Sequence, residues 1–237
     1  MLDIFQQVLH FLGHGFCHQF AERSFEAGGL QFCVCARCTG LYLGFIITLI
    51  VLLVAARSPL HKSMPAALPP QWAIIPGILL MLPLLFDGVS SYAGLRETTN
   101  LIRYLTGYAC GMGLGVLASA AVLSLWPHLN HRLSAVNKPV KLIGVLAASA
   151  VIGTLFYVAA PYTGVAAPLL VALCLWLTVA LVVLLIVSTT RLWRGAQTAA
   201  RRIGLIALSL LAALVVLALL SLLASALGLL FPWFVHP

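Results

Sequence analysis

Two short pairs of cysteine and histidine residues stand out near the start of this chain of 237 residues. His14 and Cys17 have two residues between them, as do Cys35 and Cys38, and seventeen residues separate Cys17 from Cys35. An x2 spacing brings two side chains onto one side of a tight loop, and two such loops supply the four ligands of a tetrahedral zinc ion. The spacing therefore predicts a zinc site made of His14, Cys17, Cys35 and Cys38.

The same residues leave other interpretations open. His18 or Cys33 can replace one of the four ligands. Cys35 and Cys38 can instead form a thiol–disulfide pair that passes electrons, for example to a quinone, because a helix beginning near Cys35 and the charge of Arg37 both favour a thiolate. A third interpretation treats the cysteines as small buried residues without a ligand. The pattern does not decide whether a bound metal is structural or catalytic.

A second set of polar residues combines one acid with basic and amide side chains: Asp87, Arg96, Asn100 and Arg103. A charge at membrane depth is costly and usually has a partner, so Asp87 is expected to pair with Arg103 or Arg96. Guanidinium groups also suit phosphate or carboxylate, so these four residues are candidates for an anion site or for catalysis. The alternative is a structural ion pair between two helices.

The composition indicates what holds these residues. Hydrophobic residues make up 62% of the chain and charged residues only 8%, with a mean hydropathy of +1.11. A soluble domain carries about 25% charged residues, so that class is excluded. The net charge of +8 is dispersed between apolar runs, which excludes the basic face of a nucleic-acid-binding protein. The sequence therefore predicts an all-α, polytopic integral membrane protein lying in a lipid bilayer.

Six segments are long and apolar enough to cross about 30 Å of hydrocarbon. They are residues 40–56, 72–92, 101–126, 142–160, 165–187 and 203–231. The chain then divides into four parts: an interfacial Cys/His-rich segment at 1–39, a three-helix core with the polar residues at 40–126, a basic loop at 127–141, and three apolar packing helices at 142–237. In the first part Leu2, Phe5, Val8, Leu9 and Leu12 follow a helical spacing, which predicts a short helix in the plane of the membrane interface.

The distribution of Lys and Arg predicts the orientation, because cytoplasmic loops carry the excess of these residues. One side receives nine: Arg57, Lys62, Arg132, Lys138, Lys141, Arg191, Arg194, Arg201 and Arg202. The other side receives four: Arg23, Arg37, Arg96 and Arg103. We expect a multi-pass protein of the inner membrane with both termini outside the cytoplasm. Both polar sets then share the extracytoplasmic face, where they could form one site for an anionic lipid or isoprenoid headgroup.

The remaining patterns carry less chemistry. Gly40 with Gly44, and Gly107 with Gly111 and Gly115, form small-xxx-small series that allow close helix packing. The last three spans contain no residue that is charged at neutral pH, which disfavours a transporter or channel, since these need polar groups along a path. A purely structural membrane protein stays an alternative. No P-loop, GxSxG or HExxH motif is present, and nothing in the sequence specifies an oligomeric state.

Two blocks of sequence together resemble a family of bacterial and archaeal predicted membrane proteins known as a domain of unknown function. The first block comprises Cys17-His18-Gln19, Glu22-Arg23-Ser24 and Cys35-Ala36-Arg37-Cys38-Thr39-Gly40-Leu41-Tyr42-Leu43-Gly44; the second comprises Asp87-Gly88 and Asn100-Leu101-Ile102-Arg103-Tyr104-Leu105-Thr106-Gly107. The resemblance covers about residues 14–120. It implies membership of a membrane family but implies no reaction.

Overall fold

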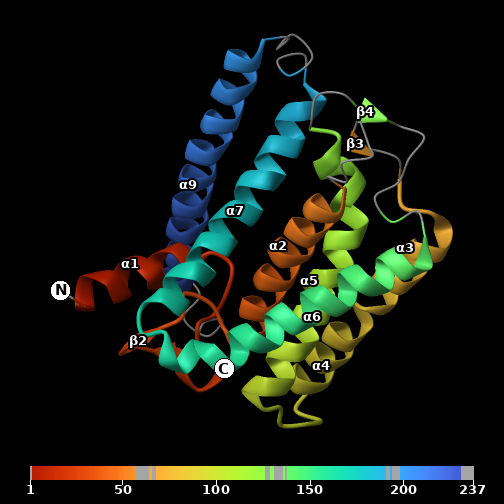
Figure 1. Ribbon diagram of the computed structural model, residues 1–237. Coiled ribbons are helices and arrows are strands. Elements are labelled where there is room, and N and C mark those ends of the chain that lie inside the picture. Colours follow the sequence, from red (N-terminus) through yellow and green to blue (C-terminus); the bar gives the residue numbers. More distant parts are fainter. Residues whose placement is uncertain are drawn as a thin grey trace. The chain divides into compact units, whose positions relative to one another are not determined.

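The computed structural model describes residues 2–56, 64–65, 68–125, 129–130, 136, 138–190, 193 and 198–230. Helices dominate the described residues (Figure 1). The longer helices are α1 (Leu2–His14), α2 (Ala36–Ala56), α3 (Gln71–Leu79), α4 (Leu82–Tyr92), α5 (Asn100–Leu123), α6 (Pro139–Ala159), α7 (Ala166–Thr189) and α9 (Ala199–Leu230). The short elements are η1 (Ala21–Arg23), β1 (Glu26–Ala27), β2 (Leu30–Gln31), β3 (Met64–Pro65), β4 (Leu129–Asn130) and η2 (Ala160–Tyr162).

The prediction of six membrane spans is confirmed. Within the described residues, six helical segments are long and apolar enough to cross a bilayer: Ala36–Ala56, Gln71–Tyr92, Asn100–Leu123, Pro139–Tyr162, Ala166–Thr189 and Ala200–Leu227. The orientation and the interfacial position of the first segment stay predictions. Several residues behind these predictions lie outside the described part of the chain: Arg57, Lys62, Trp126, Arg132, Arg191, Arg194 and Phe231.

The chain forms two compact units. The first unit comprises residues 1–38 and 159–237, and the second comprises residues 39–158. The boundary falls inside α2, whose first turn belongs to the first unit. The predicted Cys/His residues all lie in the first unit, and Asp87, Arg96, Asn100 and Arg103 all lie in the second.

In the first unit, α7 and α9 pack along each other, and α1 packs against both (Figure 1). The helical spacing predicted for residues 2–12 is present in α1. Leu9 is buried, whereas Phe5 and Val8 are 48% and 51% exposed. Ser221 of α9 secures the end of α1, because its hydroxyl donates to the Phe11 carbonyl and accepts from the Gly15 N–H group. These bonds supply partners for backbone groups that a helix end leaves unpaired.

A tight hairpin lies between α1 and α2 and was not anticipated from the sequence. Strands β1 and β2 pair antiparallel, with Glu26 opposite Gln31 and Ala27 opposite Leu30. Gly28 and Gly29 form the turn with φ values of 61° and 74°, the left-handed pair that a two-residue hairpin turn requires. A Cβ atom on Gly28 would also lie 2.6 Å from the backbone of Gly164.

In the second unit, glycines bring α2 and α5 into backbone contact. A Cβ atom on Gly44 would lie 2.5 Å from the Tyr108 carbonyl oxygen, and one on Gly111 would lie 2.7 Å from the Phe45 nitrogen. A Cβ atom on Gly40 would collide with the Tyr104 carbonyl oxygen. The interpretation of these glycines as packing positions is therefore confirmed.

The second span consists of two helices in sequence. Pro76 lies inside α3, and Pro83 lies in the first turn of α4. Proline has no N–H group and cannot donate a helical hydrogen bond, so it breaks or kinks a helix. Leu80 and Met81 form a short turn at the junction, where the Met81 N–H group donates to the Ile78 carbonyl at 2.9 Å. The span prediction was correct in extent and missed this break.

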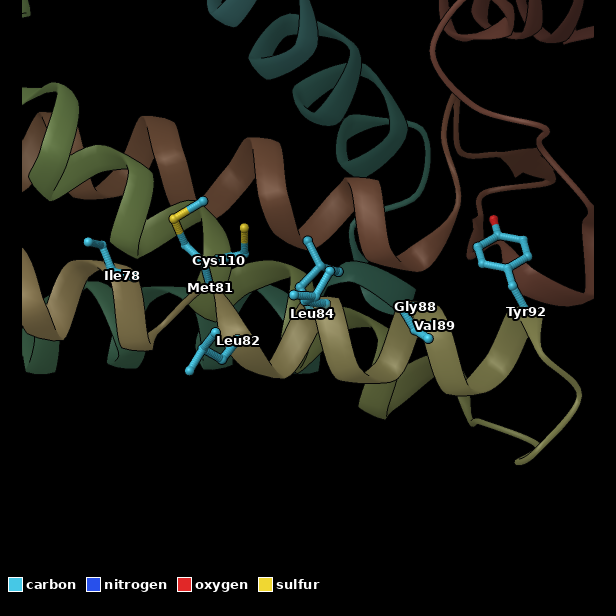
Figure 2. A pocket seen from close by; sticks show the side chains of 9 residues that line it. Ile78, Met81, Leu82, Leu84, Gly88, Val89, Tyr92 and Cys110 are labelled. Carbon is cyan, nitrogen blue, oxygen red and sulfur yellow. The ribbon is translucent and has the colours of Figure 1, made fainter.

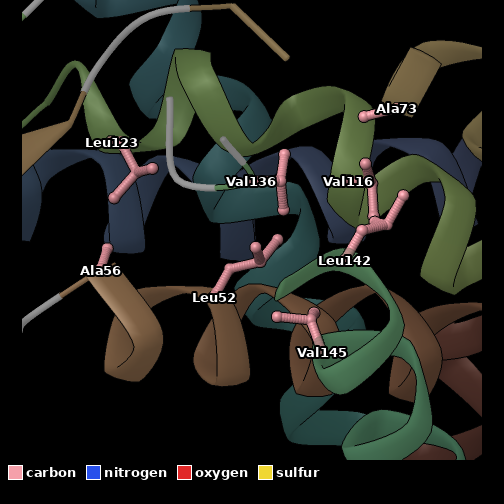
Figure 3. Close-up of a cluster of buried hydrophobic side chains, with 8 residues drawn as sticks. All are labelled: Leu52, Ala56, Ala73, Val116, Leu123, Val136, Leu142 and Val145. Carbon is pink, nitrogen blue, oxygen red and sulfur yellow. The ribbon is translucent and has the colours of Figure 1, made fainter. Parts of the chain in front are cut away.

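Buried apolar side chains and tyrosine hydroxyls connect the remaining helices of the second unit. One cluster joins α2, α3, α5, α6 and the segment before α6 (Figure 3). Its members are Leu52, Ala56, Ala73, Val116, Leu123, Val136, Leu142 and Val145. Farther along α5, the Tyr104 hydroxyl donates to the Gly153 carbonyl of α6 at 2.8 Å, and the Tyr108 hydroxyl donates to that of Ser149.

Candidate functional site

The sulfur atoms of Cys17, Cys35 and Cys38 meet in one cluster, hereafter the thiol cluster. The three atoms lie within 4.8 Å of one another. Sulfur ligands about 2.3 Å from a tetrahedral zinc ion lie about 3.8 Å apart, so small side-chain movements suffice to surround an ion. Among the described His, Cys, Asp and Glu residues, these three cysteines form the group whose ligand atoms lie close enough together to hold a metal ion. The three sulfurs come from the two segments that the sequence spacing singled out.

The start of α2 positions two of the three thiols. Helix α2 begins at Ala36, so Cys35 occupies the position before its first turn and Cys38 lies within that turn. The backbone N–H groups of Cys38 and Arg37, at the beginning of the helix, help to lower the pKa of the Cys35 thiol.

Cys17 reaches the cluster from the other side. The turn after α1 forms because the N–H groups of Phe16 and Cys17 both donate to the Gly13 carbonyl at 3.0 Å. The Cys17 sulfur then accepts a hydrogen bond from the Cys35 N–H group at 3.2 Å. A backbone donor aimed at a sulfur stabilises its negative charge, and such bonds are common features around metal-bound thiolates.

The thiols perturb one another's acidity. Hydrogen bonds from the thiols of Cys17 and Cys38, together with the backbone donors, hold the pKa of Cys35 well below its ordinary value. Sharing its proton with Cys35 raises the pKa of Cys17 to about 11. A lowered pKa favours the thiolate, which is the form in which a cysteine binds metal or attacks a disulfide.

The structure places the other predicted ligands outside this group. His14 ends α1 and stacks on His10, with ring centroids 5.9 Å apart. His18 is exposed and stacks on Phe20. Cys33 is fully buried, and burial raises the pKa of its thiol to about 12. The role of these three residues as ligands stays a prediction.

Gln19 is part of this site and was assigned no role from the sequence. Its side chain is buried and donates to the backbone carbonyl oxygens of His10 and Cys33. The only sequence signal for a role of Gln19 was its position directly after Cys17 and His18 in the motif. The contacts themselves depend on how α1 and the segment before α2 come together, which no spacing in the sequence reveals.

In the second unit, Asp87 pairs with Arg96. The distance between Nη2 of Arg96 and Oδ1 of Asp87 is 2.9 Å, and the Asp87 side chain is 1% exposed while that of Arg96 is 42% exposed. The Arg96 guanidinium also lies 5.6 Å from the centre of the Phe86 ring. Of the two partners expected for Asp87, the structure shows this contact with Arg96.

Arg103 and Asn100 contact each other at the start of α5. Arg103 is buried, and its Nε and Nη1 atoms donate to the hydroxyl of Thr98 and to Oδ1 of Asn100, each at 3.0 Å. Thr98 was not among the predicted site residues. Thr98 and Asn100 thus help to orient the Arg103 guanidinium through hydroxyl and amide oxygens.

Replacement of Arg96 by Met should destabilise the protein measurably. The carboxylate of Asp87 is buried and would lose a charged hydrogen-bond donor, a loss worth about 1.5–3 kcal/mol. Thermal unfolding in detergent should therefore show a midpoint lower by roughly 3–12 °C, at about 2–4 °C per kcal/mol for a chain of this size. The neighbouring Glu97 is exposed, so Glu97→Gln is the control and should change little. Equal midpoints for the two variants would contradict the stabilising role of the ion pair.

An apolar pocket of about 630 Å³ lies along α3, α4 and one residue of α5 (Figure 2). Ile78 lies toward one end and Tyr92 at the other, with Cys110 of α5 among the lining side chains (Figure 2). No acid, base or amide lines it. The lining is therefore almost wholly apolar, without the converging polar groups that usually orient a bound ligand.

Helix content and apolar spans define the class: this is a polytopic α-helical membrane protein. Residues 17–117 match the model of the family described as predicted membrane protein (DUF2085). The chain is 37% identical over 102 residues to an uncharacterized protein of Methanothermobacter thermautotrophicus, a match covering 43% of this chain and 82% of that relative. It is 34% identical over 96 residues to the uncharacterized protein MJ1492 of Methanocaldococcus jannaschii, covering 40% of this chain and 56% of that relative.

The chain therefore belongs to the DUF2085 family of predicted membrane proteins, as the resemblance of its motifs implied. The matched residues 17–117 contain the thiol cluster as well as Asp87, Arg96, Asn100 and Arg103. No solved structure matches the chain.

Proposed function

We propose that this membrane protein binds a zinc ion through Cys17, Cys35 and Cys38. The observation that carries the proposal is the meeting of the three sulfur atoms within 4.8 Å of one another. Three thiolates are soft ligands that favour Zn²⁺ over hard cations such as Mg²⁺ and Ca²⁺. The N–H group of Cys35, aimed at the Cys17 sulfur, supports the same ligand chemistry.

The ligand set leaves one tetrahedral position for a further group. Structural zinc sites are closed by four protein ligands, whereas catalytic sites have three and keep one position for water or substrate. His14, three residues before Cys17, is the protein side chain that we propose for a closed site. With water there instead, the ion would supply an acidic water or polarise a bound carbonyl or phosphoryl oxygen.

Elemental analysis of the purified protein tests the proposal. We expect one zinc ion per chain in the wild type and loss of zinc in Cys17→Ser, Cys35→Ser and Cys38→Ser. Cys110→Ser is the matched control, because Cys110 is a buried cysteine outside the cluster, and it should keep its zinc. Zinc far below one per chain in fresh wild-type protein, or zinc unchanged in the Cys35→Ser variant, would overturn the proposal.

A second candidate function is thiol–disulfide exchange, favoured by the placement of Cys35 at the start of α2 and by its lowered pKa. Oxidation of Cys35 and Cys38 to a disulfide would release two protons and two electrons to an acceptor such as a quinone. A membrane-impermeant thiol reagent, applied to intact cells with and without reductant, distinguishes this function from zinc binding. Labelling that requires reductant supports the redox pair, and it also tests the inferred location of this segment outside the cytoplasm of an inner membrane.

For the second unit we propose contact with an anionic lipid or isoprenoid headgroup through Arg96, Asn100 and Arg103. The support is the 42% exposure of the Arg96 side chain beside its ion pair, and the orientation of Arg103 by Thr98 and Asn100. An anionic short-chain phospholipid should bind the wild type more tightly than the Arg96→Met variant. Equal affinities would exclude Arg96 from the contact.

A further inference from the structure

The side chain of Gln19 connects the two segments that carry the cysteines. It lies two residues after Cys17, and its Nε2 atom donates to the carbonyl oxygen of Cys33, two residues before Cys35, at 2.6 Å. The same Nε2 atom donates to the carbonyl oxygen of His10 in α1 at 2.8 Å. One amide group therefore holds together the loop of Cys17, the loop of Cys35 and the last turns of α1.

The orientation of this amide follows from its surroundings. Both neighbouring groups are carbonyl oxygens, which only accept, so the NH₂ end of the side chain must face them. Gln19 is 5% exposed, and its Oε1 atom has no hydrogen-bond partner among the described residues. The contribution of the side chain to this junction thus comes from its two donor hydrogens.

The backbone at Gln19 is also specialised. Its φ angle is +54°, a left-handed conformation that residues other than glycine, asparagine and aspartate adopt rarely. The Gln19 carbonyl accepts from Nε2 of Gln31 at 2.9 Å, and the Gln31 N–H group donates to Oε1 of Gln6 in α1 at 2.8 Å. Glutamine is present at a position where glycine would be less strained, which indicates that its side chain is needed there.

Gly13 allows α1 to come close enough for these bonds. A Cβ atom at residue 13 would collide with the carbonyl oxygen of Cys33 and would lie 2.6 Å from Nε2 of Gln19. The helix backbone, the Gln19 amide and the Cys33 carbonyl are therefore in direct contact. Movement of α1 away from this junction would release the segment that leads into Cys35.

We propose that Gln19 is the positioning residue of the thiol cluster, and that through it ion binding at the cluster and packing of α1 stabilise each other. The inference rests on the proposed zinc site. If docked α1 holds the cysteines in place for the ion, then the ion must hold α1 in place to the same extent, because coupling between two equilibria is reciprocal. When water completes the site, none of the three cysteine ligands belongs to α1, and Gln19 transmits the effect of the ion to His10 and to α1.

The test measures zinc affinity by chelator competition in Gln19→Glu, Gln19→Met and Gln19→Gly variants. Glutamate keeps the shape of the side chain but presents an oxygen to both carbonyl groups. Methionine removes the two donor hydrogens without adding charge. Glycine removes the donors as well and also relieves the strain of the positive φ angle. Residues supporting metal ligands typically contribute a factor of about 10–100 in metal affinity, and we expect a loss in this range for all three variants. The control is Gln7→Glu, an exposed glutamine of α1, which should bind zinc as the wild type does.

Hydrogen exchange of the α1 amides provides a readout that a merely structural role would not change. Zinc should slow exchange in α1 of the wild type and of Gln7→Glu, and should no longer do so in Gln19→Met. If wild-type protein binds zinc and the Gln19 variants bind it equally well, the inference is wrong while the zinc site stands. If α1 exchange in the wild type does not respond to bound zinc, the coupling is wrong. If the wild type binds no zinc, the proposed function itself fails.

Discussion

Removal of zinc should lower the unfolding midpoint of the wild-type protein. It should not change the unfolding midpoint of a Cys38→Ser variant. The three cysteines lie in the turn after α1, in the residue before α2 and in the first turn of α2, so an ion bound by them closes a loop that includes the β1–β2 hairpin. A ligand that binds only the folded state stabilises it by about 4 kcal/mol when its free concentration is a thousand times its dissociation constant.

For a chain of this size, that stabilisation corresponds to a shift of roughly 8–16 °C in the unfolding midpoint. The measurement is thermal unfolding in detergent with added zinc and with excess chelator. The Cys110→Ser variant should show the same change in unfolding midpoint on addition of chelator as the wild type. Re-addition of zinc should restore the midpoint of both proteins. A shift of equal size in wild type and Cys38→Ser would show that the chelator acts elsewhere.

The second large effect is expected from Gly111→Leu in α5. A Cβ atom at this position would collide with the Leu41 carbonyl oxygen and would lie 2.7 Å from the Phe45 nitrogen. Because both atoms belong to the backbone of α2, no change of side-chain rotamer can make room, and the two helices must separate. Overpacking usually costs about 1–3 kcal/mol, and we expect a cost at or above the upper end of that range.

Gly144→Leu is the matched control for this prediction. Gly144 lies in α6, and a Cβ atom there would meet nothing within 4 Å, while leucine has the better helix propensity. The yield of monodisperse protein and the unfolding midpoint should fall sharply for Gly111→Leu and stay near wild type for Gly144→Leu. Similar behaviour of the two variants would contradict the close approach of α2 and α5.

The contacts within the candidate site were predictable only where they depend on local spacing. Cys35 and Cys38 are separated by two residues at a helix start, so their proximity follows from one turn of backbone. Cys17 was grouped with them by an empirical spacing rule, and its sulfur does lie in the cluster. For Asp87 two arginine partners were compatible with the sequence, and the structure shows the ion pair with Arg96, which depends on the path of the loop before α5.

The sequence by itself determined that this is a six-span helical membrane protein of the DUF2085 family, since hydrophobic length and motif residues are properties of contiguous segments. The hairpin at Gly28 and the break after Pro76 also follow from local glycine and proline residues, although they were not predicted. Tertiary structure decided the place of Gln19 between His10 and Cys33. The physical reason is the range of the interactions. A span needs only its own apolar residues and internal hydrogen bonds, whereas the Gln19 amide finds its acceptors only after α1 has packed beside the segment that leads into Cys35.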